Sequence, residues 1–290
     1  MAGVVIRRLV GRSDLKYVAE LVKREDWGLS LPNLMNFYNI SPSGWWVAEK
    51  SDGSVVGSCK LFTLEDNITC HGGMFVVDKQ HRDQGIGTKL SYTAFRGAQD
   101  KNILITTLKP ELNLKLFKPL HDITIMSLKK TNQKLPPLRR TGFRILPLAD
   151  VPLERLEKYD ARIHPVKRTA VFHRFIIADA SFVFVALESM SGDVIGYGAL
   201  KRTSTEWEFC PTYADTDDVG YELIRTMLDK VPDGNTIEVT PFAENQKAID
   251  VYKEIGFYTK STAMLMYSKK PVIIPTKKVF STAGSDYVLM

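Results

Sequence analysis

The residues whose types and spacing could do chemistry lie between Met74 and Leu90. An apolar run, Phe75–Val77, is followed by a polar segment and then by Gly85-x-Gly87 at the start of a predicted helix. Such a junction directs several unpaired backbone N–H groups and the positive end of a helix dipole toward one point. Glycine lets a ligand approach the backbone closely, and Arg82 adds a fixed positive charge. The pattern predicts an anion-binding site suited to a pyrophosphate.

Spacing separates three kinds of phosphate-binding loop. No G-x-x-x-x-G-K-[ST] run exists in the chain, which excludes a Walker loop. A dinucleotide-binding G-x-G-x-x-G needs glycine where Leu90 stands, and leucine is too bulky there for close helix–strand packing. What remains is Arg82-x-x-Gly85-x-Gly87 directly after a strand. This motif resembles the acetyl-CoA-binding loop of the GNAT superfamily of N-acetyltransferases, whose signature is Gln/Arg-x-x-Gly-x-Gly/Ala.

A second motif lies in the other half of the chain, Asn245-x-x-Ala248-x-x-x-Tyr252-x-x-x-Gly256-Phe257. Ala248, Tyr252 and Gly256 are four residues apart, which places them on one stripe of a helix that Gly256 can end. This segment resembles the other well-known GNAT segment. With one signature in each half, the chain is similar to tandem GNAT proteins, and the second half resembles a divergent YitH-type domain.

The elements around these motifs repeat along the chain. Alternating strand and helix patterns indicate an α/β chain, and the hairpin over 46–61 recurs over 184–200 with the same glycine-to-leucine distance. The resemblance implies two acyltransferase-like domains, each with a mixed, mainly antiparallel sheet flanked by helices. We expect a GNAT domain that binds acetyl-CoA over 1–134, a linker over 135–142 and a degenerate GNAT-like domain over 143–290.

The two halves differ at the predicted anion loop. Aligning Cys210 with Val77 places Asp215–Asp218, with its three carboxylates, on Arg82–Gly85. A carboxylate ~4 Å from a phosphate oxygen costs about 4 kcal/mol at an effective dielectric near 20, more than a helix N-terminus returns. We therefore expect one acetyl-CoA per chain, in the first domain. The matching helix of that domain, predicted over 111–119, lacks the motif tyrosine and contains a proline.

The resemblance also implies which residues hold the cosubstrate. In the family, the strand before the loop pairs with the pantetheine amides, and the loop backbone meets the phosphates. The residues expected to bind acetyl-CoA are Phe75, Val76, Val77, Arg82, Asp83, Gln84, Gly85, Ile86, Gly87 and Thr88.

In GNAT enzymes an amine attacks the thioester directly, so the amine must first lose a proton. In the histone-acetyltransferase branch of this family, a glutamate six residues before the last strand valine is the base. The resemblance therefore implies His71, six residues before Val77, as the candidate base, and its unperturbed pKa near 6.5 would let it accept the proton. Its alternative is a hydrogen-bonded strand residue, and Glu65 and Asp66 are further candidates. The general acid of the family is commonly the motif tyrosine, here Tyr252, whose alternative is a packed helix residue.

Composition limits the remaining function classes. The 290 residues are 44% hydrophobic and 25% charged, as in an ordinary globular protein. No apolar run approaches the ~20 residues of a membrane span, and no signal peptide is predicted. The three cysteines, Cys59, Cys70 and Cys210, lack metal-ligand spacing and indicate buried, reduced thiols in the cytoplasm or nucleus.

The sequence therefore predicts an N-acetyltransferase that transfers an acetyl group from acetyl-CoA to an amine of a small molecule or a lysine, with no metal and no membrane. A non-catalytic acyl-CoA-binding or scaffold protein is the alternative, because the first half lacks the tyrosine. Nucleic-acid binding rests only on the net charge of +6 and on no recognisable motif.

Overall fold

The computed structural model describes residues 3–131, 142–164 and 166–284. The chain divides into two compact units, one of residues 1–105 with 267–270 and one of residues 106–266 with 271–290. Apart from Gly142, the predicted linker 135–142 lies outside the described residues. The domain boundaries 1–134 and 143–290 stay a prediction, and each unit is described by itself below.

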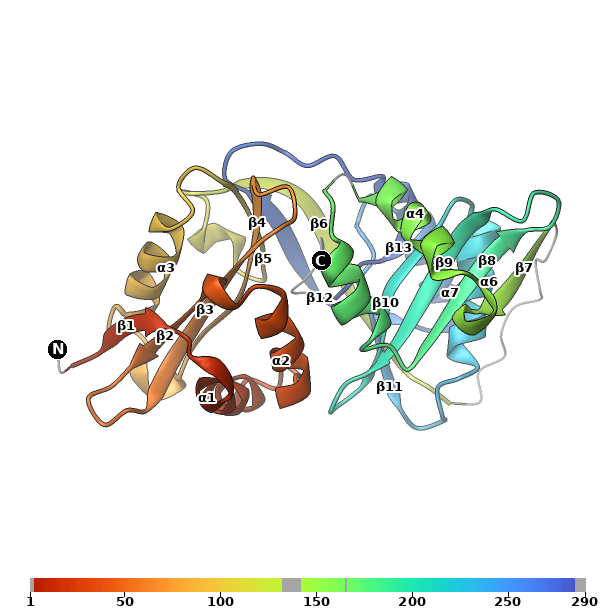
Figure 1. Cartoon of the computed structure of the whole chain (residues 1–290). Coiled ribbons are helices and arrows are strands. Elements are labelled where there is room, and N and C mark those ends of the chain that lie inside the picture. The colour runs from red at the N-terminus through yellow and green to blue at the C-terminus, as the bar shows by residue number, and fades with distance from the viewer. Residues whose placement is uncertain (1–2, 132–141, 165, 285–290) are drawn as a thin grey trace. The chain divides into compact units, whose positions relative to one another are not determined.

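The described residues of the first unit form five neighbouring strands of a mixed sheet and three α-helices (Figure 1). In sheet order its strands are β1 (Val5–Arg8), β2 (Trp45–Glu49), β3 (Val55–Thr63), β4 (Thr69–Val77) and β5 (Asn102–Thr107). Its helices are α1 (Gly11–Arg24), α2 (Leu31–Ile40) and α3 (Ile86–Arg96). The β4–β5 pair is parallel, while the pairs from β1 to β4 are antiparallel. The sheet is therefore mixed and mainly antiparallel, as expected.

Local sequence explains the two helices that precede the hairpin. Leu15, Val18 and Val22 recur at helical spacing and are fully buried on α1. The α2 helix begins with a capping box in which Ser30 and Asn33 exchange side-chain and backbone hydrogen bonds. Asp14 stands within the first turn of α1, and its carboxylate accepts from the Val10 N–H at 2.6 Å.

Strands β4 and β5 pair over only part of their length. The parallel register joins Thr69–Gly72 to Asn102–Ile105. Beyond Gly72, β4 continues to Val77, and among the described strands only β3 pairs with that continuation. One edge of β4 is thus left without a described strand partner just before the strand reaches the predicted anion loop.

The second unit is a larger mixed sheet with helices on it (Figure 1). In sheet order its strands are β12 (Tyr258–Tyr267), β6 (Lys118–Lys129), β11 (Thr236–Val239), β10 (Trp207–Ala214), β9 (Val194–Arg202), β8 (Phe182–Glu188) and β7 (Phe143–Pro147), and β13 (Val279–Ser281) pairs with β10. Its helices are α4 (Leu153–Ile163), α5 (Thr169–Val171) with a π-helical turn (Phe172–Ile177), α6 (Asp217–Leu228) and α7 (Gln246–Ile255). A core of apolar side chains from β8–β11, α6 and α7 fills the space between sheet and helices.

The helix predicted over 111–119 is wrong. The structure has only a 3₁₀ turn, Pro110–Leu112, followed by strand β6, which contains Pro119. Proline cannot donate the hydrogen bond that an α-helix needs at that position. No helix among the described residues is long and apolar enough to cross a membrane.

Candidate functional site

The connection from β4 to α3 is an eight-residue loop, Asp78–Gly85. Two of its residues have left-handed backbone conformations, Asp83 with φ 61° and Gly85 with φ 76°. Such a conformation favours glycine and is tolerated by aspartate. A Cβ placed on Gly85 would have no other atom within 4 Å, so the backbone here faces open space.

The loop presents a run of free backbone donors. In the described part of the chain, none of the backbone N–H groups of residues 82–88 donates to a protein acceptor, and the first such bond runs from Lys89 N–H to Gly85 O at 3.0 Å. Most of these residues, among them Gly85 and Thr88, are exposed to solvent. Consecutive free N–H groups at a helix start form an anion-binding site. The predicted loop therefore has the geometry that phosphate binding requires.

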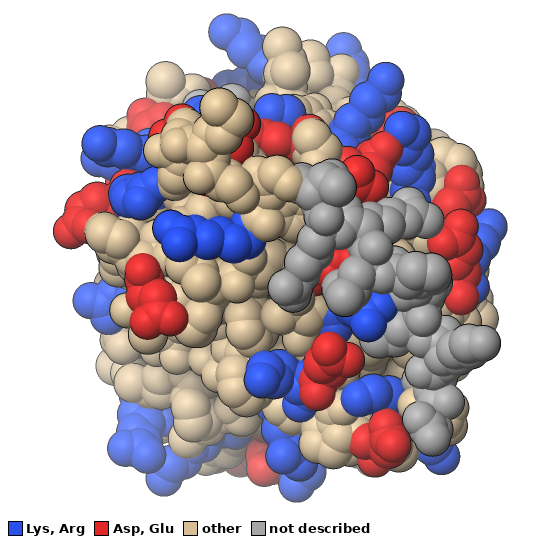
Figure 2. Space-filling view, turned by 90° about the vertical axis from the view of Figure 1, so that its right-hand side faces the viewer, with Lys and Arg blue, Asp and Glu red and all other residues tan. Residues whose placement is uncertain are grey.

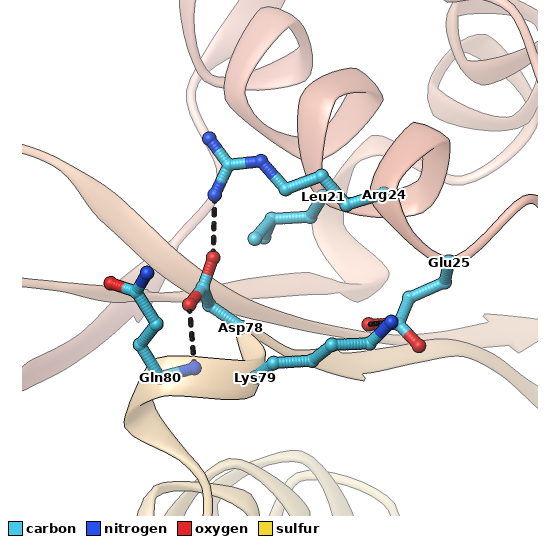
Figure 3. Close-up of a pocket in the computed structure, with 6 residues that line it drawn as sticks. All are labelled: Leu21, Arg24, Glu25, Asp78, Lys79 and Gln80. Carbon is cyan, nitrogen blue, oxygen red and sulfur yellow. Dashed lines mark hydrogen bonds and ion pairs between the residues drawn. The ribbon is translucent and has the colours of Figure 1, made fainter.

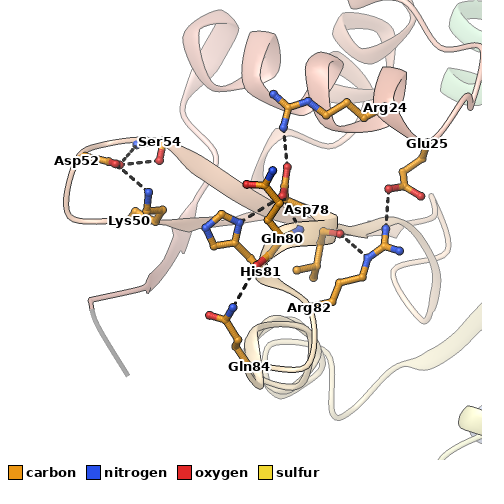
Figure 4. Close-up of polar contacts among 11 residues, drawn as sticks. Arg24, Glu25, Lys50, Asp52, Ser54, Asp78, Gln80, His81, Arg82 and Gln84 are labelled. Carbon is orange, nitrogen blue, oxygen red and sulfur yellow. Dashed lines mark hydrogen bonds and ion pairs between the residues drawn. The ribbon is translucent and has the colours of Figure 1, made fainter.

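The Arg82 side chain braces this loop. Its Nε donates to Val77 O at 2.9 Å, and its Nη2 donates to Glu25 Oε1 at 2.6 Å (Figure 4). The guanidinium thus closes the loop onto its own strand and ties it to the end of α1. The positive charge predicted at Arg82 is thus present but is paired with the Glu25 carboxylate.

A hollow of about 480 Å³ lies beside the loop, lined by Leu21, Arg24, Glu25, Asp78, Lys79 and Gln80 (Figure 3). Asp78 organises it, since its carboxylate accepts from Arg24 Nη1 at 2.6 Å and from the Gln80 N–H at 2.9 Å. Burial opposes ionisation, but these bonds and His81 hold the pKa of Asp78 below its usual value. Sequence reasoning missed these residues because Arg24 and Glu25 are distant in the chain. Only Asp78, directly after a strand, carried a capping signal.

The strand end next to the loop carries the other residues that the sequence predicts to bind the cosubstrate. Phe75 is 48% exposed, Val76 is buried and Val77 is half-buried. A Cβ on Gly87 would lie 3.2 Å from Phe75 Cζ, so the first turn of α3 sits close over this part of β4. The structure therefore brings the residues of strand and loop together in one place.

The candidate base His71 lies in the middle of β4, opposite Phe62 on β3, and is fully buried. Burial lowers the pKa of His71 to about 4, so the imidazole is neutral at pH 7 but a weak proton acceptor. Asp66 caps its own turn by accepting from the Thr69 N–H at 2.9 Å. The catalytic role of His71 stays a prediction, which its burial weakens.

Sequence reasoning also missed Lys60, a second buried titratable group near Phe62. The Lys60 Nζ lies 3.7 Å from the centre of the Phe62 ring and 4.4 Å from that of Trp45, and it donates to Phe37 O. Burial holds the pKa of Lys60 well below its usual value. The neutral forms of both His71 and Lys60 are thus favoured in this core.

The candidate acid Tyr252 lies in the second unit. It is fully buried on α7 with its ring centroid 5.0 Å from that of Phe257. Burial raises the pKa of Tyr252, against a small opposing effect of the Thr212 hydroxyl. A tyrosine in this setting is a poorer acid than a solvated one. Its assignment as the general acid stays a prediction.

Strand register gives the true correspondence between the halves. Gly57 pairs with Val77 in the first unit, and Gly196, its counterpart in the repeat, pairs with Ala214 in the second. Ala214, rather than Cys210, is therefore the counterpart of Val77. The sequence alignment of the two loops was wrong by four residues, because the glycine-to-leucine match in the hairpins did not extend to the next strand.

The residue after each strand confirms this register. Asp78 N–H donates to Val56 O at 2.9 Å, and Asp215 N–H donates to Ile195 O at 2.8 Å. In the second unit α6 starts only two residues later, after Asp215 and Thr216. The second half thus lacks the loop because the segment is missing, and not because carboxylates replace its glycine and arginine.

What remains of the second connection is satisfied within the unit. Asp215 Oδ1 accepts from Lys278 Nζ at 2.9 Å and from the Tyr159 hydroxyl at 3.3 Å. The Thr216 side chain caps α6 by accepting from the Val219 N–H. Among the described residues of this connection, only the backbone N–H groups of residues 216–218 have no protein acceptor, a shorter run than that at residues 82–88.

Surface charge, possible metal ligands and cysteines point to no second site among the described residues. Figure 2 shows Lys and Arg interspersed with Asp and Glu on the face in view. Among the described residues, no three His, Cys, Asp or Glu side chains are grouped as a metal site. The three cysteines are buried and form no disulfide.

Comparison with known proteins agrees with the geometry. A family model of an acetyltransferase (GNAT) domain matches residues 41–119, and a second model with the same description matches residues 156–281. The chain is 24% identical over 261 residues to holothin acyltransferase of Pseudoalteromonas sp. (strain SANK 73390), which covers 89% of this chain and 85% of that protein.

Two solved structures share the whole fold. A Pyrococcus horikoshii protein assigned as an acetyltransferase is 16% identical, with a TM-score of 0.79 over 99% of this chain and 96% of that one. A tandem GNAT protein from the clavulanic acid biosynthesis pathway is also 16% identical, with a TM-score of 0.67 over 91% and 97% of the two chains. The family models and the curated relative support acyl transfer as the class of activity. The chain belongs to the GNAT family and consists of two GNAT domains in tandem.

Proposed function

We propose that this chain is an N-acetyltransferase that uses acetyl-CoA as its cosubstrate and holds it in the first unit. The observation that carries the proposal is the run of free backbone N–H groups at residues 82–88, next to an edge of β4 without a described strand partner. The loop would accommodate the pyrophosphate of acetyl-CoA, since its backbone N–H groups have no protein acceptor and the space over Gly85 is open. The pyrophosphate would meet the loop, and the pantetheine arm would follow Phe75–Val77.

The reaction follows from the cosubstrate. The acceptor amine, once deprotonated, attacks the thioester carbonyl carbon, so a C–N bond forms and the C–S bond breaks. The amine proton leaves to a base, and the CoA thiolate takes up a proton. No covalent intermediate on the protein is required. The residues of this unit bind and orient the thioester, and His71 is the proposed proton acceptor, directly or through a water.

The base assignment has its own test. His71→Gln, which removes the titrating ring, should lower kcat at least 100-fold at an unchanged KM for acetyl-CoA if His71 accepts the proton. The wild-type pH profile should then show an inflection near the low pKa of His71. An unchanged kcat in a folded variant would remove His71 from the mechanism.

A non-catalytic acyl-CoA-binding protein is the second candidate. It is favoured by the first unit's lack of the motif tyrosine and by the 3₁₀ turn at Pro110–Leu112 in place of a helix. Thiol release from acetyl-CoA, followed across a broad panel of amines, separates the candidates. Amine-dependent release supports the enzyme, while tight acetyl-CoA binding with no release supports the binding protein. The YitH-type assignment of the second half stays a prediction.

A further inference from the structure

A short strand, β13, fills the edge of β10 that β11 leaves open. Parallel pairing of β10 with β11 covers only Trp207 and Glu208. Further along, β13 pairs antiparallel with β10, with Ser281 opposite Thr212 and Val279 opposite Tyr213. The second unit therefore has the same divergence of two parallel strands as the first, but here a segment of the chain lies within it.

Side chains and backbone hold β13 on both sides of this divergence. Toward the end of β11, Thr240 N–H donates to Ser281 Oγ at 2.9 Å, and Thr282 N–H donates to Thr240 O at 3.1 Å. Asn245 Nδ2 donates to Val279 O at 3.0 Å. Ser281 and Thr282 are fully buried. The segment is thus bound as an extended peptide with specific polar partners.

The position of β13 corresponds to a predicted cosubstrate position. Because Ala214 is the counterpart of Val77, Tyr213 corresponds to Val76, and Thr212 corresponds to Phe75 by count. In the first unit these are strand residues proposed to pair with the pantetheine arm. An extended peptide offers the same kind of alternating amide donors and acceptors, without a phosphate.

An aromatic anchor completes the site. Phe280 is fully buried, and a Cβ on Gly220 of α6 would lie 2.4 Å from its ring. Lys278 Nζ reaches the Asp215 carboxylate at 2.9 Å, at the place where the first unit carries its anion loop. The space over Gly220 and the acidic side chain of Asp215 therefore suit a basic–aromatic peptide rather than an anion.

We propose that the second unit is a peptide-binding module, in which the extended segment Lys278–Thr282 occupies the cleft that a GNAT domain uses for acyl-CoA. This inference rests on the proposed function, because the position of the cleft is taken from the acetyl-CoA site proposed beside β4 in the first unit. The ligand class is an extended peptide with a basic residue, a buried aromatic two positions later and small hydroxyl residues after it. The resident ligand is the chain's own segment.

The test uses the full chain with a protease site inserted between Pro271 and Val272, in an extended segment whose Ile273 is 85% exposed. After cleavage of the folded protein, a fluorescent synthetic peptide of residues 272–290 is added and its exchange for the resident segment is followed by anisotropy. We expect saturable exchange, at least 100-fold weaker for a Phe280→Ala peptide and unchanged for Lys277→Ala, because the Lys277 side chain is exposed. Excess acetyl-CoA should not displace the peptide.

Absence of saturable exchange, equal binding of both variant peptides, or displacement by acetyl-CoA would overturn the proposal. If the cleaved protein unfolds, hydrogen exchange on the uncut chain decides: the Thr282 amide should be protected at least 1000-fold, and rapid exchange would refute a seated strand. Failure of acetyl-CoA to bind at all would refute the proposed function and leave the peptide result standing.

Discussion

The two strand-to-helix connections of this chain start alike and end differently. Asp78 and Asp215 follow equivalent strands and make the same backbone bond to the neighbouring strand. In the first unit six further residues and Gly85 precede the helix, whereas in the second only Thr216 does. The sheet geometry was thus kept in both copies, while the anion loop is present in one. The same sheet scaffold can therefore carry strand-to-helix connections of different length and chemistry.

The two units also differ at the strand edge beside each connection. In the first unit no described strand covers the end of β4, while in the second β13 covers the end of β10. Where the loop is missing, the cleft is filled by protein. The two differences together lead us to propose that only the first unit binds acyl-CoA.

The largest effect should come from placing a carboxylate in the loop of the first unit. Gly85→Asp should weaken acetyl-CoA binding 100- to 1000-fold, because a carboxylate ~4 Å from a phosphate costs about 4 kcal/mol. Gly85→Asn is the matched control, since asparagine has the same size and also tolerates the left-handed conformation. Calorimetry measures both. Equal losses in the two variants would show that charge at the loop is not what matters.

Acid should destabilise the protein through its buried histidines. The pKa of His71 is lowered to about 4 in the folded state, so between pH 6.5 and 4 the unfolded state binds more protons. The free energy of unfolding should therefore fall by about 3 kcal/mol over this range from His71 alone. Urea denaturation of His71→Gln should show a shallower pH dependence than the wild type.

The second unit supplies the matched comparison for that measurement. His164 is buried as well, and burial, aided by Arg168, lowers its pKa to about 3. His164→Gln should flatten the pH dependence to a similar degree. An unchanged slope in both variants would show that these rings are not buried in the neutral form.

Replacement by alanine should affect the two helix glycines, Gly220 and Gly87, to different degrees. A Cβ on Gly220 would lie 2.4 Å from the Phe280 ring, so Gly220→Ala should cost about 1–3 kcal/mol of unfolding free energy. A Cβ on Gly87 would lie 3.2 Å from the half-exposed Phe75 ring, and alanine favours the helix by up to ~1 kcal/mol, so Gly87→Ala should be near neutral. Thermal denaturation compares them, and a well-tolerated Gly220→Ala would contradict the packing of Phe280 on α6.

The smallest effect should come from breaking the ion pair between Arg82 in the loop and Glu25. Glu25→Gln removes a negative charge next to Arg82 and frees its guanidinium, so acetyl-CoA should bind up to about fivefold tighter at low salt, since exposed ion pairs contribute up to ~1 kcal/mol. Asp100→Asn, four residues beyond the C-terminal end of α3, is the control. Weaker binding by Glu25→Gln would show that the brace positions the loop.

Much of the fold could be predicted from the sequence because periodicity and turn residues encode it locally. The hairpin predicted over 46–61, formed by β2 and β3, and the end of α7 at Gly256 are confirmed. The strand, the loop and the helix start at Gly85 lie where the sequence predicted them, because glycine spacing next to a strand directly reflects backbone conformation. That this loop binds an anion stays a prediction. The fold and the family are confirmed by the structure and the comparisons.

The misses share a physical cause, which is contact between residues distant in the chain. The sequence around Arg82 does not predict its ion pair with Glu25, and the sequence around Tyr213 does not predict that β13 pairs with β10. The loop alignment was wrong because the connection from β10 to α6 is shorter than that from β4 to α3. The acidic residues there gave no sequence pattern that would reveal the difference in length. His71 shows a further limit, since its residue type indicates a base but only the fold reveals its burial.

The central claim is that each chain binds one acetyl-CoA, in the first unit. Native mass spectrometry of the full chain with saturating acetyl-CoA tests it directly, with Gly85→Asp and Gly85→Asn measured alongside. We expect one bound acetyl-CoA for the wild type and for Gly85→Asn, and none for Gly85→Asp. Two bound molecules in the wild type, or one retained by Gly85→Asp, would contradict it.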